Sequence, residues 1–213
     1  YDTETKNLNK RYDTGLGTMQ FNLDPVTSYV VPWFHWESPF TSKDFEQMQE
    51  IFRDLWTKPV NFPYWVMHNG KFECNITRNS FGTSIYSAQI FDTQSGGFLL
   101  DENRPDRKAL FKYGIYTLKQ LALDYLGFDG YQSSVLEARG EGSLMDLPLD
   151  KLSEYGGLDT ALTLLLKDAM LKHAKAQGYT EQFMNLQFYL YSPMTNLFSD
   201  VEYNGMPASK QHL

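Results

Sequence analysis

Residues 64–73 read Tyr64-Trp65-Val66-Met67-His68-Asn69-Gly70-Lys71-Phe72-Glu73 and predict a buried strand that leads directly into a helix. The first four residues are wholly apolar, which is typical of a strand covered on both faces. Polar residues follow at once, so His68, Asn69 and Glu73 are expected at the mouth of an α/β sheet, where functional side chains gather. The alternative for Asn69 is a helix cap without a chemical role.

The segments on either side of residues 64–73 predict a mixed α/β fold, because strands come first and then alternate with helices. Alternating and β-branched runs indicate the strands, and apolar residues at helical spacing indicate the helices. The expected strands are 18–23, 28–33 and 86–92, the helices are 43–56 after a Ser42 cap, 118–126, one from an Asp146 cap to about 178 and one from about 180, and the loops are 94–107 and 130–142.

Length and composition are those of a soluble globular domain, with 213 residues, 42% hydrophobic residues and a net charge of -7. No run approaches the roughly 20 apolar residues that a membrane span requires, so a membrane-spanning helix is excluded. The single cysteine, Cys74, excludes an internal disulfide framework and favours an intracellular setting. The acidic charge supplies no long-range attraction for nucleic acid, so any contact with DNA or RNA has to be local.

Two patterns of acidic residues are candidates for chemistry. Asp2-Thr3-Glu4 places two carboxylates on one side of an extended strand, a geometry that can grip a metal ion. The same spacing recurs at 44–46 and 200–202, so a lone copy favours a solvated strand end. Tyr155-Gly156-Gly157-Leu158-Asp159 places a phenol one helical turn before a carboxylate, and its two glycines indicate a close backbone approach.

The order of these patterns resembles that of the DEDDy 3′-5′ exonucleases, the proofreading domains of family-A, polymerase I-like DNA polymerases. Asp-x-Glu comes first, Asn-x-x-Phe-acid follows a strand, and Tyr-x-x-x-Asp lies late in a helix. Phe91-Asp92-Thr93 and Leu147-Pro148-Leu149 extend the resemblance over nearly the whole chain. It implies a ribonuclease H-like fold of class α/β, with a mixed five-stranded sheet flanked by helices.

The resemblance also implies a site and a reaction. With two divalent ions, Mg²⁺ or Mn²⁺, the enzyme would hydrolyse the last phosphodiester bond at the 3′ end of single-stranded DNA and release nucleoside 5′-monophosphates. Tyr155 would orient the attacking water. The implied metal ligands and catalytic carboxylates are Asp2, Glu4, Glu73 and Asp159. The residues implied against the terminal nucleotides are Leu8, His68, Asn69 and Phe72. Core packing is the alternative for Leu8 and Phe72, and a backbone partner at the strand end is the alternative for His68.

The last part of the sequence carries a second resemblance. Ser192-Pro193-Met194 and Val201-Glu202-Tyr203-Asn204-Gly205-Met206 are similar to the passage from exonuclease to polymerase domain in the same enzymes. An exonuclease domain is therefore expected over 1–178, and a helical segment leading into a polymerase domain of the same parent chain over 179–213. The expected location is the cytoplasm of a bacterial or phage-infected cell, or an organelle.

Glu73 departs from the family pattern, which has aspartate at that position. The extra methylene moves the carboxylate outward by about 1.5 Å, and a misplacement of about 1 Å can cost on the order of 100-fold in rate. Three hypotheses therefore stay open: a proofreading DNA exonuclease, an RNA exonuclease of the ribonuclease D kind, and a catalytically impaired exonuclease scaffold.

Overall fold

The computed structural model describes residues 1–6, 15–58, 63–83, 85, 89–103, 114–131, 133–140 and 142–205. Its strands are β1 (Asp2–Thr5), β2 (Leu16–Asn22), β3 (Ser28–Pro32), β4 (Tyr64–Met67) and β5 (Gln89–Asp92). Its helices are α1 (Ser42–Thr57), α2 (Gly70–Phe81), α3 (Thr93–Leu100), α4 (Leu118–Leu126), α5 (Ser133–Arg139), the 3₁₀ turn η1 (Leu144–Asp146), α6 (Leu149–Ala176), α7 (Thr180–Asn185), the π-helical η2 (Leu186–Tyr191) and α8 (Ser192–Asn204).

The mixed α/β class is confirmed, but a single five-stranded sheet is not found among the described residues. Strand β2 pairs antiparallel with β1 and β3, and β4 pairs parallel with β5 as a separate sheet. The two sheets meet where the backbone nitrogen of Tyr1 donates to the carbonyl oxygen of Val66 at 3.0 Å. Strand β1 is only four residues long and shifts register between Glu4 and Thr5, which leaves it little length for a second ladder.

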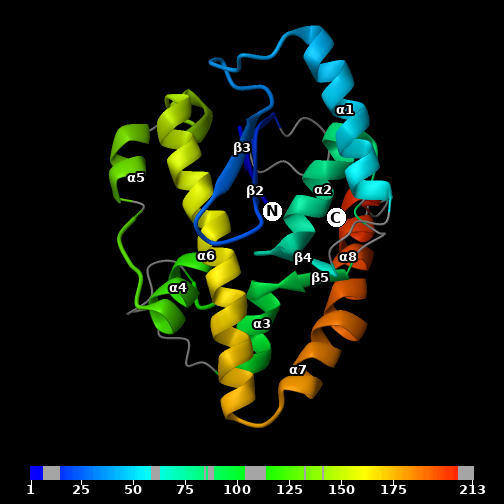
Figure 1. Cartoon of the computed structure of the whole chain (residues 1–213), viewed down its shortest axis with the longest axis vertical. Helices are drawn as coiled ribbons and strands as arrows, with labels where there is room; N and C mark the ends of the chain where they lie inside the picture. Colours follow the sequence, from blue (N-terminus) through cyan, green and yellow to red (C-terminus); the bar gives the residue numbers. More distant parts are fainter. Residues whose placement is uncertain are drawn as a thin grey trace, which may run out of the picture.

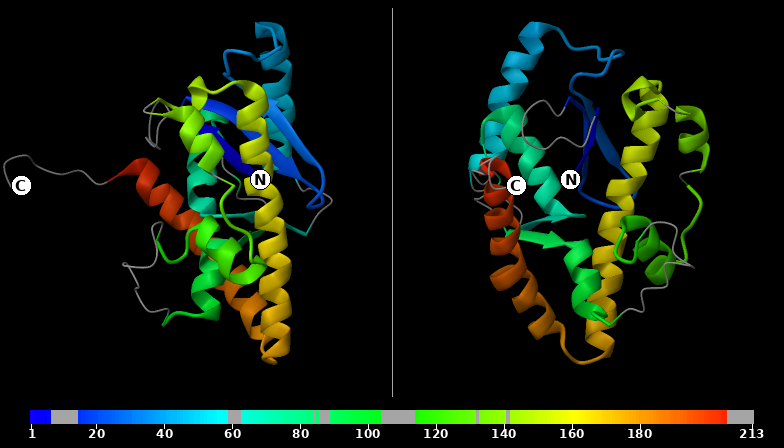
Figure 2. Two further views of the ribbon diagram at one scale, coloured as in Figure 1. Left: turned by 90° about the vertical axis from the view of Figure 1, so that its left-hand side faces the viewer. Right: turned by 180° about the vertical axis from the view of Figure 1, so that it is seen from behind.

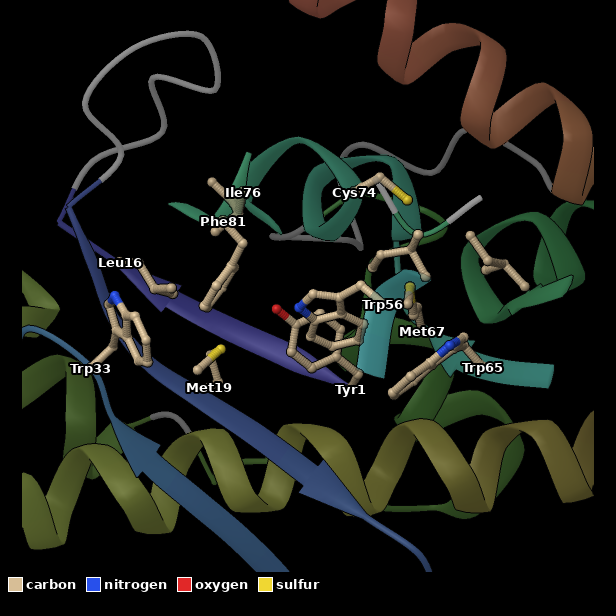
Figure 3. Packing of buried hydrophobic residues seen from close by; sticks show 12 residues of the cluster. Tyr1, Leu16, Met19, Trp33, Trp56, Trp65, Met67, Cys74, Ile76 and Phe81 are labelled. Atoms are coloured by element: carbon tan, nitrogen blue, oxygen red, sulfur yellow. The ribbon is translucent and has the colours of Figure 1, made fainter. Parts of the chain in front are cut away.

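Helices cover both faces of the strands. The long helix α6 runs along one face, and α1 and α2 lie on the other (Figures 1 and 2). Aromatic side chains fill the space between the strands and helices α1 and α2. The ring of Tyr1 lies 4.7 Å from that of Trp56 on α1, which lies 4.9 Å from that of Trp65 (Figure 3). Tyr1 therefore anchors β1 from the face opposite to Asp2 and Glu4, because side chains alternate along a strand.

Two segments expected to be loops contain helices, α3 and α5. Helix α3 is capped by Asp92, whose side chain accepts from the backbone nitrogen of Gln94 at 2.8 Å. A Cβ atom at Gly97 would lie 2.8 Å from the Leu121 side chain, so the glycine permits close contact with α4. Tertiary packing thus stabilises a helix that its glycine content disfavours.

The predicted caps of two other helices are wrong by a few residues. Helix α1 is capped by Thr41 and not by Ser42, because the Thr41 side chain accepts from the backbone nitrogen of Asp44. Asp146 lies in η1, where it forms a capping box with the preceding serine, and α6 begins only at Leu149. Residues 86–88 of the strand expected over 86–92 lie outside the described residues.

The two glycines of α6 make close contact with the antiparallel sheet, as their pattern predicts. A Cβ atom at Gly156 would lie 2.6 Å from Nε2 of Gln20, and one at Gly157 would lie 3.1 Å from Cβ of Ser28. The Ser28 hydroxyl donates to the carbonyl oxygen of Gly157 at 2.9 Å. This approach brings the part of α6 that carries Asp159 close to β1.

In the described part of the chain, no helix combines the length and the apolar character that a membrane span requires.

Candidate active site

Three of the four predicted carboxylates meet between β1 and α6. Asp2 and Glu4 project from the same face of β1, and Asp159 reaches them from the glycine-packed part of α6. One oxygen atom of each lies within 4.8 Å of the others. Glu4 and Asp159 are buried and Asp2 is half-buried, so the three carboxyl groups are largely removed from solvent.

Burial and mutual repulsion make these carboxylates hard to ionise in the absence of a cation. Burial, followed by repulsion from Asp159, raises the pKa of Asp2 to about 7. The pKa of Glu4 is raised well above its ordinary value by burial and by repulsion from Asp2 and Asp159. Burial raises the pKa of Asp159 to about 6. Such a group has a strong electrostatic requirement for a cation.

The donor set fits a hard divalent cation. All three side chains offer carboxylate oxygens, the ligands that Mg²⁺ and Mn²⁺ prefer, and they already lie close enough to share an ion. Asp2, Glu4 and Asp159 are therefore the residues that would hold it.

Glu73 lies beside this group but is not one of the three. It occupies the first turn of α2 and is 2% exposed, and its Oε1 lies 3.5 Å from the Thr3 hydroxyl. Its Oε2 is buried and has no hydrogen-bond partner among the described side chains and backbone groups. Burial and the nearby Asp2 raise the pKa of Glu73 well above its ordinary value. Asp2 therefore links Glu73 electrostatically to the other two carboxylates.

Tyr155 lies at the same site and has a partner that the sequence did not reveal. Its hydroxyl accepts a hydrogen bond from Nζ of Lys119, in the first turn of α4, at 2.8 Å. Burial, followed by repulsion from Asp159, raises the pKa of the Tyr155 phenol, so the phenol stays protonated near neutral pH. A lone lysine at the start of an amphipathic helix carries no pattern that distinguishes it from a solvated one.

Tyr131 is a second residue that the sequence did not reveal. Its hydroxyl donates to Oδ1 of Asp159, and its ring stacks on that of Tyr155 with centroids 6.1 Å apart. The segment 130–142 was expected to be a loop, and a single tyrosine in it gave no signal. Tyr131 orients the Asp159 carboxylate in the way that outer partners orient metal ligands.

The predicted substrate-binding residues at the start of α2 depend on Asp92. Asn69 has a left-handed backbone with φ of 59°, and its side chain does not cap the helix. The Asp92 carboxylate does so instead, because it accepts from the backbone nitrogens of Asn69 at 3.1 Å and Gly70 at 2.8 Å. Asn69 is therefore the N-cap residue of α2, as the cap alternative expects, but its side chain makes no capping hydrogen bond. Phe72 is half-buried and packs against the aromatic core, and Leu8 lies outside the described residues.

His68 has a side-chain partner and not the backbone partner considered above. Its Nδ1 lies 2.9 Å from the Thr93 hydroxyl, which lies 3.2 Å from the carbonyl oxygen of Met67. When the Thr93 hydroxyl donates to Met67, Nδ1 of His68 is the donor to Thr93, and in the other tautomer Nδ1 accepts from Thr93 and Nε2 carries the hydrogen. Burial, reinforced by Lys119, lowers the pKa of His68 to about 3, so the ring is neutral at physiological pH.

Comparison with known proteins assigns the chain to a family. A family model described as 3′-5′ exonuclease matches residues 1–175, so the chain belongs to this exonuclease family. The match confirms the resemblance to the proofreading exonuclease domain of polymerase I-like enzymes. The chain is also similar in fold to a solved structure titled "apo form of the nuclease", with a TM-score of 0.61, 16% sequence identity, and coverage of 97% of this chain and 86% of that one. A search of curated proteins finds no match.

Raising the pH from about 5 to about 8 is expected to increase the stabilisation that Mg²⁺ gives the fold. The pKa values of Asp2 and Asp159 in the folded, metal-free chain are about 7 and about 6, whereas an unfolded Asp has a pKa of about 3.9. The folded state therefore binds more protons between about pH 4 and pH 7, and the free energy of unfolding of the metal-free chain falls as the pH rises through this range.

Mg²⁺ has to displace these protons, so the Tm difference between Mg²⁺ and EDTA should be small at about pH 5 and large at about pH 8. Thermal denaturation followed by circular dichroism measures this difference. In Asp159→Asn the difference should nearly vanish at both pH values. An equal Mg²⁺ effect in the parent and in Asp159→Asn would contradict the assignment of the site.

Proposed function

We propose that this chain is a 3′-5′ exodeoxyribonuclease that removes 3′-terminal nucleotides of DNA by two-metal hydrolysis. The single observation that supports it best is the meeting of the Asp2, Glu4 and Asp159 carboxylates within 4.8 Å, beside Tyr155. A cluster of buried acids is costly unless it binds cations, and in a chain of this family the purpose of such a cluster is phosphodiester hydrolysis. The proposal extends to a proofreading role beside a polymerase domain, with the exonuclease domain spanning 1–178.

The residues of the site have distinct roles in this reaction. Bound Mg²⁺ or Mn²⁺ would supply Lewis-acid stabilisation of the negative charge on the attacking and leaving oxygens. Asp2, Glu4 and Asp159 would hold the ions, with Glu73 completing the set from α2. Tyr155 stays protonated, so it orients the attacking water and does not deprotonate it.

The start of α2 would bind the terminal nucleotides. The Asn69 side chain makes no capping bond, and His68 contacts Thr93 through Nδ1, so the Asn69 amide and Nε2 of His68 can contact a nucleotide. The Phe72 ring is half-buried, which leaves part of it to contact a base or sugar. Leu8 is proposed as a wedge between the last two bases on the strength of the family resemblance alone.

Binding of single-stranded DNA is expected to be weak and local, because a net charge of -7 gives no general attraction for phosphates. Cations at the carboxylates would bridge protein and phosphate and supply the missing attraction. The dissociation constant for a single-stranded oligonucleotide should therefore be lower in Ca²⁺, which supports binding without efficient turnover in many Mg²⁺ enzymes, than in EDTA. Fluorescence anisotropy measures both values, and equal affinities would contradict the bridging role.

The position of Glu73 outside the three-carboxylate group favours a second candidate, a catalytically impaired exonuclease scaffold. A scaffold would keep the fold and the metal-dependent stabilisation but would release no nucleotides.

The remaining alternative is an RNA exonuclease, which would degrade RNA in preference to DNA.

The experiment that tests the proposal compares single-stranded DNA and RNA oligonucleotides of the same sequence, labelled at the 5′ end, with Mg²⁺ and with excess EDTA. The expected result is a ladder that shortens from the 3′ end, on DNA and only with Mg²⁺. Shortening of RNA alone would favour the RNA exonuclease, and no shortening of either would favour the scaffold. Digestion in EDTA would contradict the metal-dependent reaction.

A further inference from the structure

We infer that Lys119 is a positioning residue, which fixes the Tyr155 hydroxyl by a hydrogen bond so that the hydroxyl proton is directed to the reacting groups. This inference rests on the proposed nuclease function and adds to it a residue outside the three sequence motifs. It follows from the contacts of α4 and from the donor properties of an ammonium group.

Helix α4 holds Lys119 in a fixed place. Thr117 caps the helix by accepting from the backbone nitrogen of Gln120, so Lys119 lies in an ordered first turn. Leu121 and Ala122 are fully buried in the same core cluster as residues of α6, which anchors α4 against the helix that carries Tyr155. The tyrosine and the lysine therefore come from two rigid elements packed together, which is the arrangement that keeps a site precise.

The direction of the hydrogen bond determines what Tyr155 can do. An ammonium group is only a donor, so the phenol oxygen accepts from Nζ of Lys119 at 2.8 Å. The hydroxyl proton then cannot point at Lys119. Tyr155 also interacts with the Asp159 side chain through its hydroxyl. The hydroxyl proton therefore points toward the carboxylate group, where an attacking water or a phosphate oxygen would also lie.

The Lys119 ammonium group also lies near the ring, with Nζ 5.2 Å from the centroid of Tyr155. It interacts favourably with Asp159, Glu4 and Asp2. Two other roles are therefore conceivable: Lys119 could only offset the charge of the carboxylates, or it could bind substrate phosphate directly. Neither of these roles requires Tyr155, whereas the positioning role acts through it.

A double-mutant cycle separates these roles. The variants are Lys119→Met, which keeps the apolar stem, Tyr155→Phe, which removes the hydroxyl, and the combination of both. Lys119→Met is expected to slow single-turnover cleavage of DNA by about 10- to 100-fold, the usual cost of losing an outer partner. Adding it to Tyr155→Phe is expected to cause no further loss, because the group on which it acts is already absent.

Three further measurements accompany the cycle. The affinity for single-stranded DNA should be unchanged in Lys119→Met, and Lys119→Arg should recover part of the rate, because a guanidinium can also donate to the phenol oxygen. The ¹³Cζ resonance of Tyr155, identified by its loss in Tyr155→Phe, should shift in Lys119→Met. The matched control is Lys172→Met, which changes an exposed lysine about 25 Å beyond Tyr155 along α6. This substitution should change neither the rate nor the resonance.

Additive losses in the double variant, with an active parent, would overturn the positioning role and favour charge compensation. A loss of DNA affinity without a loss of single-turnover rate would overturn it in favour of a phosphate contact. If Lys119→Met is folded and the ¹³Cζ resonance of Tyr155 does not shift, the positioning role is overturned, whatever the activity of the variant. An inactive parent is a different failure, because it refutes the nuclease function itself and leaves no reaction for Lys119 to support.

Discussion

Asp159→Asn is expected to slow metal-dependent cleavage by far more than about 100-fold. Loss of a residue that only hydrogen-bonds to a metal ligand already costs about 10- to 100-fold, and Asp159 is proposed as a ligand itself. The substitution keeps the shape of the side chain and removes one of the three charges that meet within 4.8 Å. Tyr131 could still donate to the amide oxygen, so the local packing should persist. Single-turnover cleavage of a 3′-labelled oligonucleotide in Mg²⁺ measures the loss.

The matched control for this prediction is Asp168→Asn on the same helix. The Asp168 side chain is 63% exposed and pairs with Lys167 at 2.8 Å, away from the carboxylate group. Its substitution should leave the rate unchanged. If Asp159→Asn kept a rate within a few-fold of the parent, the carboxylate group would not be the site of hydrolysis.

Glu73→Asp is expected to slow cleavage by roughly 100-fold. The shorter side chain retracts the carboxylate by more than about 1 Å, and a misplacement of about 1 Å can already reduce a rate about 100-fold. The backbone of α2 cannot follow the shorter side chain. The Tyr1 hydroxyl lies 3.2 Å from the Thr77 hydroxyl, and the Ser199 hydroxyl donates to Oδ1 of Asn75 at 2.7 Å. These two contacts fix the position of α2. An increase in rate would show instead that glutamate displaces an ion and that aspartate restores its place.

Glu73→Gln separates the role of Glu73 in catalysis from its cost to the fold. Replacing the ionisable carboxyl by an amide should remove the cost of burying it and its repulsion with Asp2, and so raise the Tm of the metal-free chain near neutral pH. It should also slow cleavage, because an amide cannot replace the carboxylate as a ligand. A gain in stability with a loss of activity is common when a functional carboxylate is replaced. Thermal denaturation in EDTA and single-turnover cleavage in Mg²⁺ measure the two effects. A variant with unchanged activity would show that Glu73 is dispensable, as a scaffold requires.

The sequence predicts well which site residues share one face of a strand or helix, because these relations depend on local spacing. Asp2 and Glu4 share a strand face, and Tyr155 precedes Asp159 by one helical turn, so both pairs follow from periodicity. The glycine pair between Tyr155 and Asp159 predicted close packing, which Gln20 and Ser28 confirm. The roles of these side chains in catalysis, and the division of the chain at residue 178, stay predictions.

The contacts of Lys119, Tyr131 and Asp92 could not be predicted, because they join distant segments. The sequence singled out Asp92 only as part of the family resemblance. Lys119 acts on a residue 36 positions away, and Tyr131 on one 28 positions away. Asp92 bridges the starts of α2 and α3 through backbone nitrogens, which leaves no trace in the residue types of its partners. The helices α3 and α5 were missed because their polar and glycine content is typical of loops and tertiary contacts outweigh it.

The most direct test of the account is the chemical identity of the product released by the parent chain from a single-stranded DNA oligonucleotide in Mg²⁺. Mass spectrometry of a single-turnover reaction should detect the 3′-terminal nucleoside 5′-monophosphate and an oligonucleotide shorter by one residue, and neither product in EDTA. Internal fragments, a 3′-monophosphate, or no Mg²⁺-dependent product from a folded chain would contradict the proposal that Asp2, Glu4 and Asp159 form the centre of a 3′-5′ exonuclease.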